Sequence, residues 1–145
     1  MIARRDDGIE LDTDVDRIDR DLLHAWLSGD AYWALGRDRT TVDRSLEHSR
    51  VVAAYSPGPD ASRMLAFARM VTDDATFAWL CDVYVAPAAR GRGIGTWMID
   101  EYVSLLRDSG VYRFLLATRD AHEVYRRVGF RPLAQPERWM ELDLR

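Results

Sequence analysis

The sequence predicts an α+β fold in which a mixed, mostly antiparallel sheet with one parallel crossover is flanked by about four helices. Three observations lead to this prediction. Two helical patterns precede residue 50, three strand patterns run from there to residue 85, and helices and strands alternate after residue 87. A length of 145 residues suits one domain, residues 1–145.

The N-terminal third predicts one short strand and two helices. Residues 9–12 form the strand pattern. Asp14 or Asp16 can cap the first helix, whose apolar residues recur at helical spacing until a Ser-Gly pair ends it. Thr40 and Asp43 have the spacing of a capping box and predict a second short helix.

The middle of the sequence predicts three strands joined by turns. Strand patterns occupy residues 51–56, 64–71 and 76–85, and residues 56–60 form a turn rich in proline and glycine. Side chains alternate between the two faces of a strand, so the third strand should place one set of residues on a common face. This set is Phe77, Trp79, Cys81, Val83 and Val85.

The last third predicts two helices and two strands. A glycine-rich turn leads into an amphipathic helix that ends at Gly110. Residues 112–117 are typical of a buried strand, and Asp120 can cap a short helix over residues 121–128. Residues 139–144 predict a final strand.

Composition argues against several classes of function. The net charge is −4, whereas general nucleic-acid binding needs a basic face. All 20 basic side chains are arginine, so the chain offers no lysine for self-acetylation. We expect no membrane span, because no apolar run reaches about 18 residues, and no export signal. A single cysteine, Cys81, makes a reducing cytoplasm the expected compartment.

The most informative segment is residues 83–96, where a strand ends and three glycines alternate at the start of a helix. The first N–H groups of a helix lack partners and carry partial positive charge, which suits a pyrophosphate. Arg90 and Arg92 can add charge-assisted hydrogen bonds. The spacing G-x-G-x-G differs from that of dinucleotide folds, and no P-loop lysine follows. These residues alone fit either a loop that binds coenzyme A or a turn that only starts a helix.

Three segments together resemble the GNAT superfamily of N-acetyltransferases. Residues 90–95, Arg-Gly-Arg-Gly-Ile-Gly, match its R/Q-x-x-G-x-G/A signature. Residues 80–87 are similar to its central strand, and residues 123–130 to its aromatic-bearing helix closed by Gly-Phe. The resemblance covers residues 50–144 well. Within the superfamily, the chain is similar to one subgroup of bacterial members. It implies a GNAT-like three-layer fold and an acyltransferase that uses acetyl-CoA and no metal.

The resemblance also implies a binding site for acetyl-CoA. The glycine loop would hold the pyrophosphate, and the central strand would pair with the pantetheine arm. Many members carry an asparagine on the strand after the glycine helix, and here Thr118, Asp120 or backbone groups would replace it. The residues expected in this site are Val83, Tyr84, Val85, Arg90, Gly91, Arg92, Gly93, Ile94, Gly95, Thr96, Thr118 and His122.

The implied reaction is direct attack of a neutral amine on the thioester in a ternary complex. Tyr125 matches the family's tyrosine acid, which protonates the departing thiolate. Asp82 is the candidate base, although positioning of the reactants makes a dedicated base dispensable. The acceptor is expected to contact Tyr32, Trp33, Arg69 and Asp73, with Arg37 and Tyr84 as further candidates.

The expected acceptor is a primary amine on a small molecule. Two alternatives stay open at this point: acetylation of a protein or peptide, and an acyl-CoA-binding sensor without transfer. We expect no nucleic-acid or membrane partner. Residues 139–144 could pair across a homodimer or stay at the sheet edge of one chain.

Overall fold

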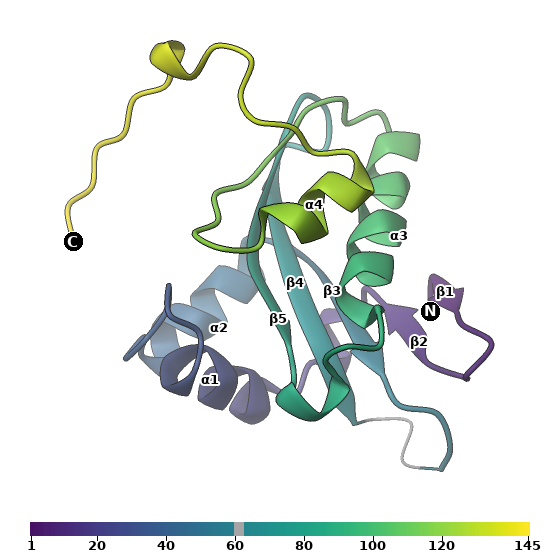
Figure 1. Cartoon of the computed structure of the whole chain (residues 1–145). Helices are drawn as coiled ribbons and strands as arrows, with labels where there is room; N and C mark the ends of the chain where they lie inside the picture. The colour runs from purple at the N-terminus through teal and green to yellow at the C-terminus, as the bar shows by residue number, and fades with distance from the viewer. Residues whose placement is uncertain (60–62) are drawn as a thin grey trace.

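The computed structural model describes residues 1–59 and 63–145, which contain one six-stranded sheet (Figure 1). The strands lie in the order β1-β2-β3-β4-β5-β6. Neighbouring strands are antiparallel except β5 and β6, which are parallel. The predicted α+β fold with one parallel crossover is therefore confirmed. The strands are β1 (Ala3–Arg4), β2 (Glu10–Asp12), β3 (Arg50–Tyr55), β4 (Met64–Thr72), β5 (Ala78–Val85) and β6 (Phe114–Leu115).

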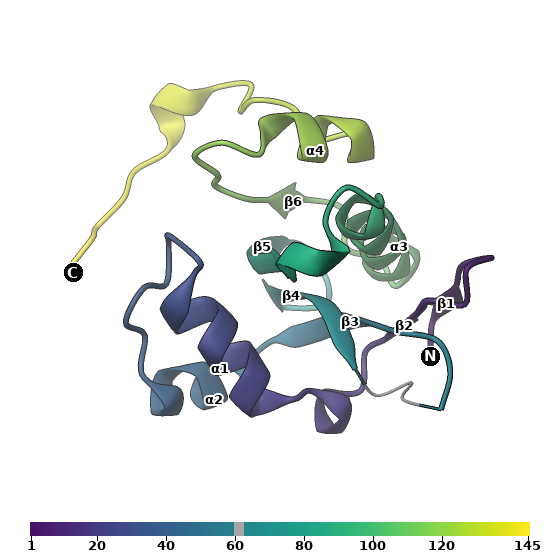
Figure 2. The same ribbon diagram turned by 60° about the horizontal axis from the view of Figure 1, so that its bottom comes forward.

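Helices cover both faces of this sheet and make three layers (Figure 2). One buried cluster includes Met98 and Tyr102 of α3, and Tyr125 of α4 packs against it. The cluster on the other face includes Leu23 of α1 and Leu46 of α2. No helix in the described residues is long and apolar enough to span a membrane. The helices are α1 (Arg20–Gly29), α2 (Arg39–Glu47), α3 (Ile94–Asp108) and α4 (His122–Val128), with 3-10 turns η1 (Val15–Arg17), η2 (Pro87–Ala89) and η3 (Pro136–Arg138).

The caps of the helices differ from the predicted ones. Asp14 caps the 3-10 turn η1, while Asp19 caps α1 by accepting the N–H of Leu22 at 2.9 Å. Asp38 caps α2 in the same way. No side chain caps α4, so the prediction for Asp120 is wrong as well. The helices themselves lie where the apolar periodicity placed them, because burial of that face decides helix formation more than the cap does.

The strands β3, β4 and β5 lie within two residues of their predicted bounds. The turn predicted at residues 56–60 extends to a residue outside the described part of the chain. β1 was not predicted, because two residues are too few to show an alternating pattern. β6 is shorter than predicted, since only Phe114 and Leu115 pair with β5.

β5 contains a bulge at Asp82. The register with β4 passes from Phe67–Tyr84 to Arg69–Cys81, so β5 carries one residue more than β4 over this stretch. Asp82 has a φ of 51°, in the left-handed region that non-glycine residues rarely adopt. The bulge holds this aspartate in a strained conformation within β5.

The extra residue reverses which side chains of β5 face each layer. Leu80 belongs to the cluster beneath α3, and Val83 packs against the same cluster although it lies three positions further on. Tyr84 belongs instead to the cluster beneath α1 and α2. The reversal makes one prediction wrong, that of a single face for Phe77, Trp79, Cys81, Val83 and Val85.

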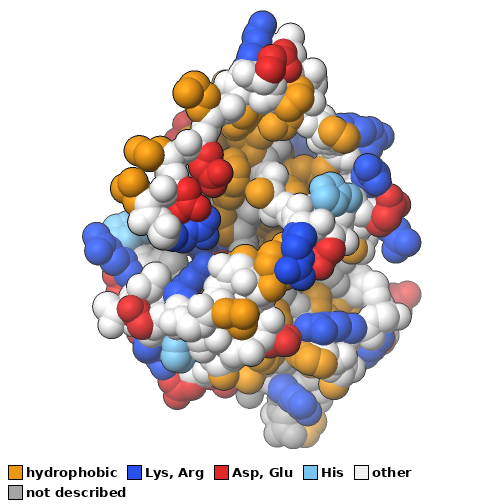
Figure 3. All heavy atoms as spheres, turned by 60° about the vertical axis from the view of Figure 1, so that its left-hand side comes forward, with side chains coloured by type: hydrophobic (Ala, Val, Ile, Leu, Met, Phe, Trp, Pro, Cys, Tyr) orange, Lys and Arg blue, Asp and Glu red, His pale blue; other side chains and the backbone are white. Residues whose placement is uncertain are grey.

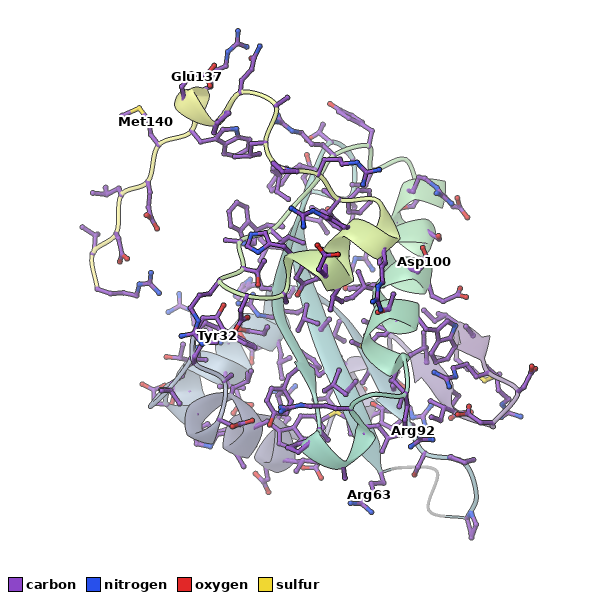
Figure 4. The ribbon with its side chains drawn as sticks, in the orientation of Figure 1. Tyr32, Arg63, Arg92, Asp100, Glu137 and Met140 are labelled. Carbon is purple, nitrogen blue, oxygen red and sulfur yellow. The ribbon has the colours of Figure 1, made fainter. Side chains whose placement is uncertain are left out.

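The C-terminal arm, residues 131–145, contains no strand, so the prediction for residues 139–144 is wrong. The arm leaves the body after α4 and passes outside the sheet (Figure 1). Met140, Leu142 and Leu144 are 97%, 84% and 87% exposed, and Figure 4 shows Met140 pointing away from the rest of the chain. A strand needs a partner for its backbone, and the arm has none in the described part of the chain.

Candidate active site

The glycine loop joins β5 to α3 and leaves the first N–H groups of that helix without a side-chain cap. Gly91 and Gly93 have φ values of 76° and 69°, which a residue with a side chain adopts at a cost. Gly95 has a different role, because a Cβ there would lie 3.0 Å from Cγ2 of Val85. These glycines shape the turn and let α3 approach β5, so the helix start faces open space as an anion site requires.

The two arginines of the loop are already bonded to their own chain. Arg90 donates from Nε to the carbonyl of Val85 at 3.0 Å and from Nη2 to Asp30 at 3.3 Å. Arg92, at the foot of the loop in Figure 4, lies 3.5 Å from Asp7. Both side chains are about half exposed, at 54% and 47%. The backbone of the loop therefore offers a more direct anion site than either guanidinium.

β5 and β6 separate towards the end of β5. They pair only at Ala78–Phe114 and Trp79–Leu115. Beyond this point, a pocket of about 370 Å³ opens between the free edge of β5, the glycine loop and α4, and we call it the loop pocket. Its lining is Val83, Val85, Ala89, Arg90, Gly91, Gly93, Ile94, Gly95, Thr96, Ala121, Val124, Tyr125 and Arg127.

The bulge places the Asp82 carboxylate among three donors. Arg69 Nε lies 2.6 Å and Arg37 Nη1 2.8 Å from its Oδ2, and Trp33 Nε1 donates to Oδ1 at 2.8 Å. The Asp82 side chain is only 2% exposed. Burial alone would raise its pKa, but Arg69 and Arg37 outweigh that effect and hold the pKa of Asp82 below its usual value.

A second pocket, of about 430 Å³, lies over this cluster, and we call it the arginine pocket. Figure 3 shows the hollow between the arm and the body, with basic side chains at its edge. Tyr32 closes one side, because its hydroxyl accepts the N–H of Arg119 at 2.9 Å (Figure 4). The lining is Tyr32, Trp33, Arg37, Arg69, Trp79, Leu80, Cys81, Asp82, Val83, Leu116, Ala117, Thr118, Asp120, Ala121, Tyr125, Glu141 and Arg145.

Tyr125 lies where the two pockets meet. Val83, Ala121 and Tyr125 line both of them. Its ring packs edge-to-face on Phe130 at 5.9 Å, which fixes the orientation of the side chain. Its hydroxyl has no hydrogen-bond partner within residues 1–59 and 63–145, and burial raises the pKa of Tyr125 to about 12. The hydroxyl is therefore a protonated donor at neutral pH, accessible from both sides.

Five predicted site residues lie elsewhere than expected. One is Arg92, which lines a separate pocket beside α1 and not the loop pocket. The Tyr84 side chain stacks on Trp26 and donates to Asp30 at 2.5 Å, so it faces α1, and Tyr84 does not line the loop pocket. Thr118 lines the arginine pocket and His122 a separate groove beside β6, so neither side chain lines the loop pocket. Asp73 accepts three N–H groups of its own turn and lines neither pocket.

Several residues of the site were not predicted. Trp79 lines the arginine pocket from the regularly paired part of β5 that precedes the bulge. Asp30 anchors both Tyr84 and Arg90 across the two layers. Glu141 enters the lining only through the path of the C-terminal arm. No local sequence signal marks these residues, since each depends on long-range contacts.

The comparisons with known proteins agree with this geometry. The model of the Acetyltransferase (GNAT) family matches residues 20–130, so the chain belongs to this family. A crystal structure of a candidate GNAT-family acetyltransferase from Xanthomonas campestris pv. campestris superposes with a TM-score of 0.86 and 37% identity, and the match covers 94% of each chain.

Two named enzymes are similar to parts of the chain. Serotonin N-acetyltransferase 2, chloroplastic, from Oryza sativa subsp. japonica is 36% identical over 96 residues, which cover 65% of this chain and 48% of that protein. Thialysine N-epsilon-acetyltransferase from Sus scrofa is 37% identical over 65 residues, covering 42% and 38%. The chain thus spans about half or less of the length of these relatives. Family membership shows that residues 20–130 form an acetyltransferase (GNAT) domain.

Proposed function

We propose that the chain transfers acetyl from acetyl-CoA to a primary amine of a small molecule by direct attack in a ternary complex. One observation supports this most strongly: the loop pocket and the arginine pocket meet at Val83, Ala121 and Tyr125. A thioester that enters along the glycine loop and an amine that enters over the arginines would meet beside the Tyr125 hydroxyl. Holding both reactants there supplies much of the rate.

Acetyl-CoA fits the loop pocket through the backbone. The N–H groups at the start of α3, from Ile94 to Thr96, would bind the pyrophosphate. The free edge of β5 at Val83 and Val85 offers backbone groups to the amides of the pantetheine arm. A backbone N–H on this edge would also stabilise the oxyanion that forms on the thioester carbonyl.

Tyr125 is the proposed general acid. The amine nitrogen attacks the thioester carbon and loses one proton to water, the tetrahedral intermediate collapses, and the C–S bond breaks. The departing thiolate then takes the proton of the Tyr125 hydroxyl, and the tyrosine regains a proton from solvent. Because burial raises the pKa of Tyr125 to about 12, its hydroxyl holds this proton at neutral pH.

Asp82 is better suited to positioning than to accepting a proton. Three donors occupy its two oxygens, and the lowered pKa makes the carboxylate a weak base. We therefore propose that the amine arrives neutral or loses its proton to water, and that Asp82 orients Arg37 and Arg69. Cys81 is not proposed as an acetyl carrier, because burial raises the pKa of its thiol and keeps it protonated.

A small-molecule acceptor is favoured over a protein or peptide. The arginine pocket ends on a floor of side chains that are at most 21% exposed, whereas a peptide needs a groove open at both ends. Two relatives are named for transfer to serotonin and to thialysine, which supports a small amine. A sensor without transfer is disfavoured by the protonated Tyr125 at the meeting point of the pockets.

We also propose that two copies form a homodimer through the C-terminal arm. Met140, Leu142 and Leu144 alternate with charged residues, as in a strand with one apolar face, and all three are exposed. The outer edge of β6 has no strand partner in the described residues. Each copy thus has an unpaired arm and an unpaired sheet edge, which a second copy can satisfy.

A thermal-shift and turnover experiment tests the function. Acetyl-CoA at about 100 times its Kd should add about 2.7 kcal/mol of stability, which raises the melting temperature by several degrees. Release of free thiol from acetyl-CoA is then measured with a panel of primary amines. Stabilisation without transfer to any amine would support the sensor, and lack of stabilisation would overturn the proposed cofactor site.

A further inference from the structure

Two arginines share one carboxylate at the floor of the arginine pocket. Arg37 and Arg69 both donate to Oδ2 of Asp82, and Trp33 occupies the other oxygen. Because the Asp82 side chain is 2% exposed and has partners on both oxygens, it has little capacity for a further cation. The floor of the pocket therefore keeps an excess of one positive charge.

Arg37 retains donors that the chain does not use. Its Nη1 donates to Asp82, and no other side-chain hydrogen bond of Arg37 exists within the described residues. A guanidinium carries five N–H donors in a planar fork. The second arginine is more fully engaged, since Arg69 donates to Asp82 and, from Nη1, to Ser49 at 3.1 Å. Arg37 thus presents unused N–H groups next to the pocket that it lines.

The other charges around the pocket do not neutralise this floor. Asp120 lies 3.4 Å from Arg119 at the rim and is 60% exposed. Arg145 pairs with Asp143 on the arm at 2.7 Å. Glu141 is exposed on the same arm, at the mouth of the pocket. Water screens these exposed groups, whereas the arginines at the floor are only 21% and 14% exposed and are screened less.

We infer that the acceptor is an amine that carries a carboxylate at its other end, and that Arg37 binds this carboxylate through its unused N–H groups. This inference rests on the proposed function. A planar carboxylate matches the fork of a guanidinium with two parallel hydrogen bonds. The carboxylate at the floor and the amine beside Tyr125 would then lie at opposite ends of one pocket, and Tyr32 and Trp79 would flank the chain between them.

The test uses amines that differ only in the anion. The full-length enzyme is assayed with 5-aminopentanoate against pentylamine, with lysine against cadaverine, and with phosphoethanolamine against ethanolamine. The carboxylated member of the first two pairs should have a kcat/KM at least about 10-fold higher, mainly through KM. Arg37→Gln should remove this preference, so the ratio of kcat/KM for 5-aminopentanoate to kcat/KM for pentylamine should fall to about 1.

Control variants separate binding from structure. Arg20→Gln removes an arginine that pairs with Asp43 on the surface and lines neither pocket, so the preference should persist in it. Arg37→Lys keeps the charge without the fork and should restore only part of the preference. If Arg37→Gln does not fold, the kcat/KM ratio of each carboxylated pair in the unmodified enzyme still tests whether a carboxylate is preferred. Arg37→Lys then tests whether Arg37 is the residue that binds it.

Each failure has its own signature. Equal kcat/KM within the carboxylated pairs would overturn the inference and leave the acetyltransferase intact. A preference confined to phosphoethanolamine would overturn the carboxylate assignment in favour of a phosphate. Transfer to no amine, despite stabilisation by acetyl-CoA, would overturn the proposed function itself.

Discussion

Replacing Asp82 by alanine should destabilise the protein strongly. The change leaves Arg37 and Arg69 partly buried without their carboxylate and removes the acceptor of the Trp33 N–H. Removal of one partner from a buried ion pair costs about 3–5 kcal/mol. At about 2–4 °C per kcal/mol for a domain of this size, the melting temperature should fall by about 6–20 °C.

A matched control exists on the surface. Asp43 also pairs with two arginines, Arg20 and Arg39, but its side chain is 32% exposed, and solvent screens such pairs. Asp43→Ala should therefore lower the melting temperature much less than Asp82→Ala does. Calorimetry of both variants at neutral pH is the assay. Equal losses in the two variants would refute the argument that burial makes the Asp82 cluster important.

The pH dependence of this cluster follows from the sign of the pKa shift. The folded-state pKa of Asp82 lies below its usual value of 3.8, so its charge stabilises the fold fully above that pH. This contribution is lost as the pH falls through the folded-state pKa. The stability difference between the wild type and Asp82→Asn should thus be constant near neutrality and narrow below about pH 3.8. A difference that widens in acid would contradict this reasoning.

Three further outcomes are expected. Tyr125→Phe should lower turnover by about 10²–10⁴-fold, while the Kd for acetyl-CoA, measured by calorimetric titration, stays the same. If the variant turns over as fast as the wild type, water protonates the thiolate. Gly93→Val should abolish acetyl-CoA binding. The control is Gly110→Val, because Gly110 also has a positive φ but lies beyond the far end of α3, so this variant should lower only stability. Equal affinity of the two variants for acetyl-CoA would show that the loop is not part of the binding site. Light scattering should give twice the 16.7 kDa chain mass for the wild type and the chain mass for Leu142→Asp with Leu144→Asp, and a monomeric wild type would rule out the dimer.

Elements that depend on local periodicity were predicted well from the sequence. The α3 helix follows a glycine turn and an amphipathic pattern, and β3 and β4 are mostly apolar runs of strand length, so each element lies near its predicted bounds. The caps were misassigned because acidic residues crowd the start of α1. Asp14, Asp16 and Asp19 all satisfy the residue preference, and only the packing of the helix selects among them.

The site was predictable where backbone chemistry defines it and less so where the fold brings distant side chains together. The loop pocket follows from residues 90–96, which are contiguous in the sequence. The arginine pocket joins Trp33, Arg37 and Arg69 to Asp82 across 13 to 49 positions of the chain. Nothing in the strand pattern marks the bulge, because the residue in the left-handed conformation is an aspartate and not a glycine.

The bulge also ties the length of β5 to the chemistry of the site. Asp82 is one residue more than regular alternation needs between Leu80 and Val83, so loss of Asp82 would restore a regular strand and leave Val83 and Tyr84 on their present faces. The carboxylate that holds Arg37 and Arg69 would be lost with it. A deletion at this position would therefore remove the floor of the arginine pocket while the wall that Val83 gives to the loop pocket stays in place.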